Sequence, residues 1–194
     1  MPLRLEKKAI RALGIAESFA SEDKLSTLAG VVMRSDLVVD GFGIERLQVS
    51  GFDATRSIVT LFENLQRNDL NSIMLSGSVL SLYNIVDVDL LSKVTKKPVL
   101  ALTFKKAKSD LARNIRLRFE PAATRQKLKL LEKLGSSEKL KLGTGYTVFV
   151  RTAGLSQIEA NKILDKFTLQ GAIPEPVRLA RLLAKTVASF SKKI

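Results

Sequence analysis

The sequence predicts an α/β fold in which helices flank one mixed sheet. Three β-rich runs come first, and helical and β patterns then alternate toward the C-terminus. Of the 194 residues, 45% are apolar, which is enough for a packed core without disulfides. We therefore expect a three-stranded antiparallel start followed by alternating helices and parallel strands, all in a single domain over residues 1–194.

Short β-rich runs separated by polar residues predict the first three strands. The run over residues 11–19 (RALGIAESF) places Glu17 near the end of the first strand. Runs over residues 25–33 and 37–49 are separated by Arg34, Ser35 and Asp36. This spacing predicts a hairpin of two further strands.

A helix and a βαβ unit are predicted next. Apolar residues recur at helical spacing over residues 57–65, and Asp53 or Thr55 would cap that helix. Residues 73–75 form a short apolar run, residues 88–94 have a helical pattern behind Asp87, and residues 99–104 return to β composition. A βαβ unit accounts for this order.

The second half is expected to be mainly helical. Residues 109–134 have a basic helical pattern that Pro121 interrupts, and residues 146–150 indicate a strand. Ser156 and Glu159 form a capping-box pattern at the start of a helix to about residue 169, which Gly171 closes, and a last helix follows Pro176. The order β-β-β-α-β-α-β-α is the outline of the RNase H-like fold.

The charge is strongly segregated along the chain. The net charge is +13, and residues 93–151 carry 16 basic and 4 acidic side chains while residues 1–92 carry 9 and 12. A positively charged surface beside a more acidic region is typical of a protein that attracts a phosphate backbone. A solvated helical surface would give the same pattern.

Composition also excludes several kinds of chemistry. The chain has no cysteine and no histidine, which excludes disulfides, thiolate zinc sites, thiol nucleophiles and histidine bases. No phosphate-binding Gly-x-x-x-x-Gly-Lys-Ser/Thr loop is present. Catalysis would have to use carboxylates, hydroxyls, lysines or a metal ion held by oxygen.

Nothing in the first ten residues is typical of a targeting signal, and no uncharged apolar run reaches the roughly 18 residues of a membrane span. We therefore expect a cytoplasmic protein without a membrane partner. A cysteine-free, lysine-rich chain suits an archaeal or thermophilic source. These patterns carry no signal for an oligomeric state.

Four residues are expected at the carboxyl edge of the predicted sheet. Glu17 ends the first strand, Asp53 follows the third, Ser76 ends the next parallel strand, and Asp87 opens a helix. Two or three oxygen ligands meeting there would hold Mg²⁺. The three acids each have a simpler alternative: Glu17 as a solvated strand end, and Asp53 and Asp87 as helix caps.

Several segments together resemble the archaeal endonuclease V-like family, also described as endonuclease dU. The resemblance spans nearly the whole chain, and its segments are LGIAESF from Leu13, Asp40-Gly41, GFDAT from Gly51, LSG from Leu75, YNIVD from Tyr83 and IPEPVR from Ile173. It implies an RNase H-like fold and a Mg²⁺-dependent DNA endonuclease, with Mn²⁺ as the other metal, that nicks at deaminated bases in DNA repair. Deoxyuridine is the expected lesion.

The resemblance also implies roles for individual residues. Glu17 and Asp53 match the first two metal-binding and catalytic carboxylates. Ser76 stands where endonuclease V has an aspartate, and Ala16 stands where relatives often have a second acid. Either Asp87 is the third metal ligand, or the site has fewer ligands, or the chemistry differs from that of endonuclease V. The expected base pocket and phosphate contacts are Gly51, Ser76, Gly77, Tyr83 and Asn84 for the base, and Lys105 and Lys106 for the phosphate.

Two other functions remain open at this point. Ser76 and Ala16 favour a nucleic-acid-binding protein that kept the fold without the hydrolysis. An inosine-directed nuclease of the endonuclease V type, acting on DNA or RNA, is the other alternative.

Overall fold

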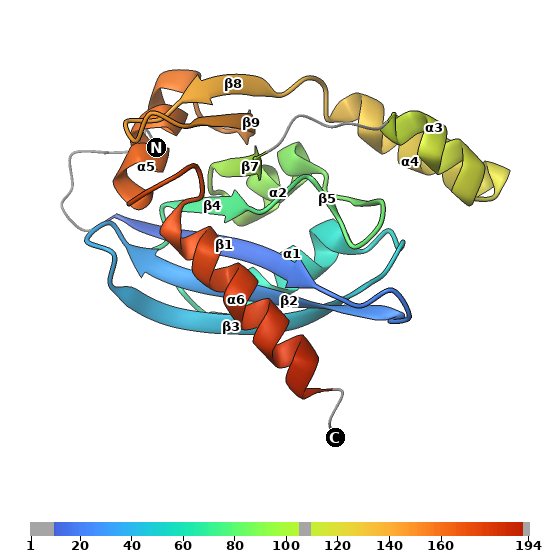
Figure 1. The fold of residues 1–194 in the computed structure, drawn as a ribbon, viewed down its shortest axis with the longest axis horizontal. Helices are drawn as coiled ribbons and strands as arrows, with labels where there is room; N and C mark the ends of the chain where they lie inside the picture. Colours follow the sequence, from blue (N-terminus) through green and yellow to red (C-terminus); the bar gives the residue numbers. More distant parts are fainter. Residues whose placement is uncertain (1–9, 105–109, 192–194) are drawn as a thin grey trace.

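The computed structural model describes residues 10–104 and 110–191 of the chain. In this part of the chain, seven strands form one sheet in the order β3-β2-β1-β4-β7-β9-β8 (Figure 1). Six helices accompany it among the described residues, and β5 and β6 pair separately. The sheet strands are β1 (Arg11–Ser18), β2 (Leu25–Arg34), β3 (Val39–Gln48), β4 (Ser72–Leu75), β7 (Val99–Thr103), β8 (Glu138–Lys141) and β9 (Thr147–Ala153).

The predicted mixed α/β sheet is confirmed. Strands β1, β2 and β3 are antiparallel, and β1, β4 and β7 run parallel to one another. The final strands extend the sheet differently from the parallel continuation expected, because β9 pairs with β7 antiparallel and β8 pairs with β9. β8 and the short β5–β6 hairpin, Val79–Leu80 with Asn84–Ile85, had no sequence signal.

Helices cover both faces of the sheet. The α1 (Ala54–Asn64) and α2 (Val88–Thr95) helices pack with one apolar cluster, which contains Leu13, Ile15 and Ile73. On the other face, α5 (Gln157–Phe167) and α6 (Glu175–Phe190) pack with a second cluster that contains Met74 and Leu100. The capping box of α5 is present, because Ser156 and Glu159 exchange hydrogen bonds as predicted.

A close backbone contact seats α6 on β1. A Cβ atom added to Gly14 would lie 2.2 Å from the carbonyl carbon of Pro176. Only glycine allows this approach, so β1 and the start of α6 are fixed against each other. Figure 1 shows α6 running across the β1–β2 part of the sheet.

The basic segment forms a helical arm beside the sheet. The α3 helix (Leu111–Arg118) and the α4 helix (Pro121–Lys133) pack together and extend away from the β7 side of the molecule (Figure 1). Asp110 caps α3 through the Arg113 N–H, and Pro121 begins α4 where its missing N–H costs nothing. None of the described helices is long and apolar enough to cross a membrane.

Candidate functional site

The carboxyl ends of β1 and β4 meet at one edge of the sheet. The two strands are parallel neighbours, and the Ser76 N–H donates to the Ile15 carbonyl at 2.8 Å. Glu17 and Ser76 therefore lie at the same edge, as predicted from the fold.

The two side chains nevertheless project to opposite faces of the sheet. Successive residues of a strand alternate between faces. Glu17 follows Leu13 and Ile15 toward the α1–α2 side, whereas Ser76 follows Met74 toward the α6 side. The β1 residue on the Ser76 face is Ala16, which is buried against Ala180 of α6.

Glu17 is held by two donors on the α1–α2 side. Its carboxylate accepts hydrogen bonds from the Ser26 hydroxyl at 2.9 Å and from the Ser81 backbone N–H at 3.2 Å. The Ser81 carbonyl in turn accepts from the Ser50 N–H at 2.7 Å. Glu17 thus joins β1 to the loop that precedes β6.

Asp53 is held by that same region. Its carboxylate accepts from the Gln48 N–H at 3.1 and 3.2 Å and from the Asn84 side-chain amide at 2.6 Å. It stands at the N-cap position of α1 but forms no side-chain cap. The Asn84 side chain caps α1 instead, because its carbonyl oxygen accepts a hydrogen bond from the Ala54 N–H at 2.9 Å.

Asn84 therefore stabilises the protein rather than facing solvent. It is fully buried, and its amide group donates both to Asp53 and to the Gln48 carbonyl. Both amide hydrogens are thus used within the fold. The structure brings Glu17 and Asp53 to the two sides of one loop, residues 81–84, with Asn84 as part of its support.

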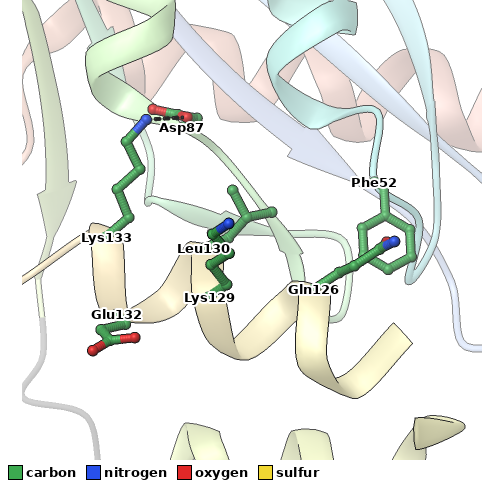
Figure 2. A pocket seen from close by; sticks show the side chains of 7 residues that line it. All are labelled: Phe52, Asp87, Gln126, Lys129, Leu130, Glu132 and Lys133. Carbon is green, nitrogen blue, oxygen red and sulfur yellow. Dashed lines mark hydrogen bonds and ion pairs between the residues drawn. The ribbon is translucent and has the colours of Figure 1, made fainter. Parts of the chain in front are cut away.

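Asp87 lies apart from this pair and caps α2, which is the simpler alternative raised by the sequence. One carboxylate oxygen accepts from the Leu90 N–H at 3.0 Å, and the other forms an ion pair with Lys133 of α4 at 2.6 Å (Figure 2). Burial raises the pKa of Asp87, but the hydrogen bond and charge of Lys133 together with the Leu90 N–H outweigh it, and the pKa lies below its usual value. Phe52, Asp87 and α4 side chains line a groove of about 630 Å³ (Figure 2).

A buried lysine joins Gly51 and Tyr83, two of the residues expected in the base pocket. The Lys127 ammonium of α4 donates to the Gly51 carbonyl at 2.6 Å and to the Tyr83 carbonyl at 2.9 Å. It also lies 3.9 Å from the ring centroid of Phe52 and 4.6 Å from that of Phe119. The Tyr83 ring packs edge-on against Phe119, so this aromatic contributes to packing between the loop and the arm.

The environment of Lys127 perturbs its titration. The side chain is 1% exposed, and burial lowers the pKa of Lys127 to about 8, while the charge of nearby Asp53 opposes part of the decrease. The sequence had shown this residue only as one of many in a basic helix. Its burial results from the docking of α4 onto the loops around Phe52 and Tyr83, and no local pattern signals it.

Ser76 and Gly77 face a different surface, on the α6 side. The Ser76 hydroxyl accepts from the Arg181 guanidinium at 2.8 Å, and the Ser78 hydroxyl accepts from Arg151 at 3.2 Å. Gly77 has a φ of +152°, a backbone conformation that favours glycine. Sequence reasoning missed both arginines, since they come from α6 and β9, far along the chain.

The donor set does not fit a metal centre of three carboxylates. Within residues 10–104 and 110–191, no group of three or more acidic side chains is placed to hold an ion. Asp87 is paired with Lys133, and the hydroxyl at the end of β4 contacts a guanidinium, which would repel a cation. Lys105 and Lys106, the expected phosphate contacts, lie outside the described residues.

Comparison of the sequence with known families and proteins gives a consistent result. A family model described as endonuclease dU matches residues 8–188. A UPF0215 protein of Pyrobaculum aerophilum is 31% identical over 182 residues, which cover 94% of this chain and 96% of the relative. A UPF0215 protein of Thermococcus gammatolerans is 34% identical over 191 residues, with 95% of each chain covered.

Solved structures confirm the fold. A crystal structure of a protein of unknown function from Archaeoglobus fulgidus has a TM-score of 0.75 at 27% identity, covering 92% of this chain and 98% of that one. The catalytic domain of human endonuclease V has a TM-score of 0.63 at 18% identity, covering 97% and 88%. Endonuclease V of Ciona intestinalis, solved with a 24mer DNA containing an inosine followed by a ribo-adenosine, has a TM-score of 0.61 at 13% identity, covering 94% and 87%.

The fold is therefore endonuclease V-like, as the resemblance of the sequence segments implied. The family model covers all but the two ends of the sequence, and curated relatives above 30% identity match along nearly their whole length. The chain belongs to the endonuclease dU family.

Proposed function

We propose that this protein binds nucleic acid at the carboxyl edge of its sheet, and that it does so without the hydrolytic metal centre of an endonuclease. The observation that carries the proposal is the placement of the α3–α4 arm. The arm is anchored at this edge by Lys127 and Lys133, and it exposes cationic side chains beside it. These are Arg113, Arg116, Arg118, Arg125, Lys129 and Lys133.

Charge and geometry both support this function. Three exposed acidic residues, Asp110, Glu120 and Glu132, lie among the six cations, and Asp87 pairs with Lys133, so the arm keeps a net positive surface. Lysine and arginine contacts to phosphates supply most of the sequence-independent affinity of nucleic-acid-binding proteins. The DNA bound by the endonuclease V of Ciona intestinalis gives further support for a nucleic-acid partner.

Binding is tested with fluorescent duplexes that contain one deoxyuridine, one deoxyinosine or neither, and with matched RNA. We expect binding that weakens steeply with salt, and that persists in EDTA. Replacing Arg116 and Arg118 by Gln should weaken binding to all sequences and reduce the salt slope by about 1 per lost phosphate contact. Salt-insensitive or absent binding would refute the proposal.

Hydrolysis at deoxyuridine sites in DNA is the second candidate function. It is favoured by the placement of Glu17 and Asp53, whose carboxylates are both held at the residue 81–84 loop on one face of the sheet. Of the expected base pocket, this candidate keeps Gly51, Tyr83 and Asn84, although the Asn84 amide is already used internally. Ser76 and Gly77 line the cleft on the α6 side instead.

The same duplexes distinguish the two candidates when they are incubated with Mg²⁺ or Mn²⁺. Nicking that disappears in Glu17→Gln and Asp53→Asn would establish the endonuclease. These variants keep the shape of each side chain and remove its charge, and unfolding midpoints verify that each variant is folded. Salt-sensitive binding with no nick in any duplex is the result that we expect.

A further inference from the structure

Two arginines face a cleft at the carboxyl ends of β4 and β7. The cleft has a volume of about 810 Å³, and Arg151 and Arg181 line it together with the Ser76–Ser78 turn. Leu111 and Leu131 of the arm and Phe149 of β9 form part of its apolar wall. We call this space the arginine cleft.

Both guanidinium groups are held in place by neutral partners. Arg181 donates from Nε to the Ser76 hydroxyl at 2.8 Å, and its guanidinium carbon lies 4.6 Å from the Phe104 ring centroid. Arg151 donates to the Ser78 hydroxyl at 3.2 Å and to the Gly135 carbonyl at 3.3 Å. Because Ser76 and Ser78 are two residues apart, their Cα atoms lie within about 7 Å, and the two cations converge on one short segment.

Neither cation has an acidic partner among the described residues. No carboxylate in residues 10–104 or 110–191 forms an ion pair with Arg151 or Arg181. Burial lowers the pKa of both guanidiniums. A partly desolvated cation without a counter-ion is costly, and a bound anion would offset that cost.

Both groups also retain free donors. A guanidinium has five N–H donors in a planar fork that matches phosphate oxygens. Hydrogen bonds among the described residues occupy one donor of Arg181 and two of Arg151. Ser136 and Ser137 also line the cleft and add polar residues to it.

We propose that the arginine cleft binds a phosphate group of a nucleic-acid strand between Arg151 and Arg181, without a metal ion. The guanidiniums supply the positive charge directly, and the apolar wall accommodates the attached nucleotide. This inference rests on the proposed nucleic-acid function and assigns its phosphate-recognition site. The strong positive charge of residues 93–151 favours a polyanion over a lone carboxylate as the occupant.

The test compares Arg151→Gln and Arg181→Gln with the wild-type protein. A Gln side chain removes the charge but keeps a polar group of moderate length. Lys185→Gln is the matched control, because Lys185 is an exposed cation on α6 one turn beyond Arg181. Affinity is measured by fluorescence anisotropy with a short labelled single-stranded oligonucleotide in EDTA, over a range of salt concentrations.

We expect each arginine variant to lose affinity about tenfold or more, as a charge-assisted phosphate contact is removed. The Lys185→Gln control should bind as the wild type does. Arg181→Lys should recover part of the affinity, which would separate a loss of charge from a loss of packing against Phe104. Unfolding midpoints verify that each variant is folded.

Three outcomes would overturn the inference. If wild type and both arginine variants bind equally, the phosphate site lies elsewhere, while the proposed nucleic-acid function stands. If the wild type binds neither this oligonucleotide nor the duplexes and RNA described above, the proposed function itself is refuted together with this site. The third outcome is measured by NMR. If saturating inorganic phosphate shifts the Nε–H resonance of Arg181 and saturating oligonucleotide does not, the occupant is free phosphate rather than nucleic acid.

Discussion

The buried Lys127 gives a prediction that links the fold to pH. Replacing Lys127 by Met keeps the length of the side chain but removes its ammonium group. The Gly51 and Tyr83 carbonyls then lose their charged donor, and the contacts with two aromatic rings are lost as well. Charged hydrogen bonds contribute about 1.5–3 kcal/mol each, and relief of the buried charge offsets part of that loss, so we expect a net destabilisation of about 2–4 kcal/mol near neutral pH.

The pH dependence follows from the direction of the pKa change. Burial lowers the pKa of Lys127 from its usual 10.5 to about 8 in the folded protein. Between these values the unfolded chain binds one proton more than the folded protein, so the stability of the wild type rises with pH through this window and reaches its full value above about 10.5. Each pH step of 1 in the window is worth about 1.4 kcal/mol.

The assay is urea unfolding followed by circular dichroism at several pH values from neutral to mildly alkaline. The difference in unfolding free energy between wild type and Lys127→Met should widen by about 2 kcal/mol as pH rises from about 8 to about 9.5. Lys129→Met, an exposed change on the same helix, is the control and should follow the wild type. A difference that stays constant or narrows with rising pH would show that Lys127 is not a desolvated ammonium in the folded protein.

Two further predictions concern stability. Gly14→Ala should lower the free energy of unfolding by about 3 kcal/mol or more, since the new Cβ would collide with the Pro176 backbone, whereas Gly143→Ala has space and should change little in thermal unfolding. Asp53→Ala should cost about 1–3 kcal/mol in urea unfolding because the buried Asn84 amide loses its acceptor, while Asp53→Asn keeps an acceptor oxygen and most of the stability. Equal stability of the two Asp53 variants would argue that the carboxylate has no supporting role.

The sequence alone determined the features that depend on neighbouring residues. Residue periodicity predicted the three antiparallel strands and the βαβ unit, and the spacing of Ser156 and Glu159 predicted the start of α5. The segregation of charge along the sequence predicted a basic segment over residues 93–151, which contains the α3–α4 arm. These features can be predicted from the sequence because the interactions behind them are local. Helical hydrogen bonds, the alternation of side chains along a strand and helix caps each involve residues only a few positions apart.

Only the tertiary structure decided which side chains meet at the sheet edge. Arg181 reaches Ser76 across 105 positions of sequence, and Lys127 reaches Gly51 across 76. Asn84 caps α1 from a distant segment, so the cap that the sequence assigned to Asp53 or Thr55 comes from elsewhere. Such contacts depend on how helices dock onto the sheet, and that docking is governed by long-range packing that leaves no local pattern in the chain.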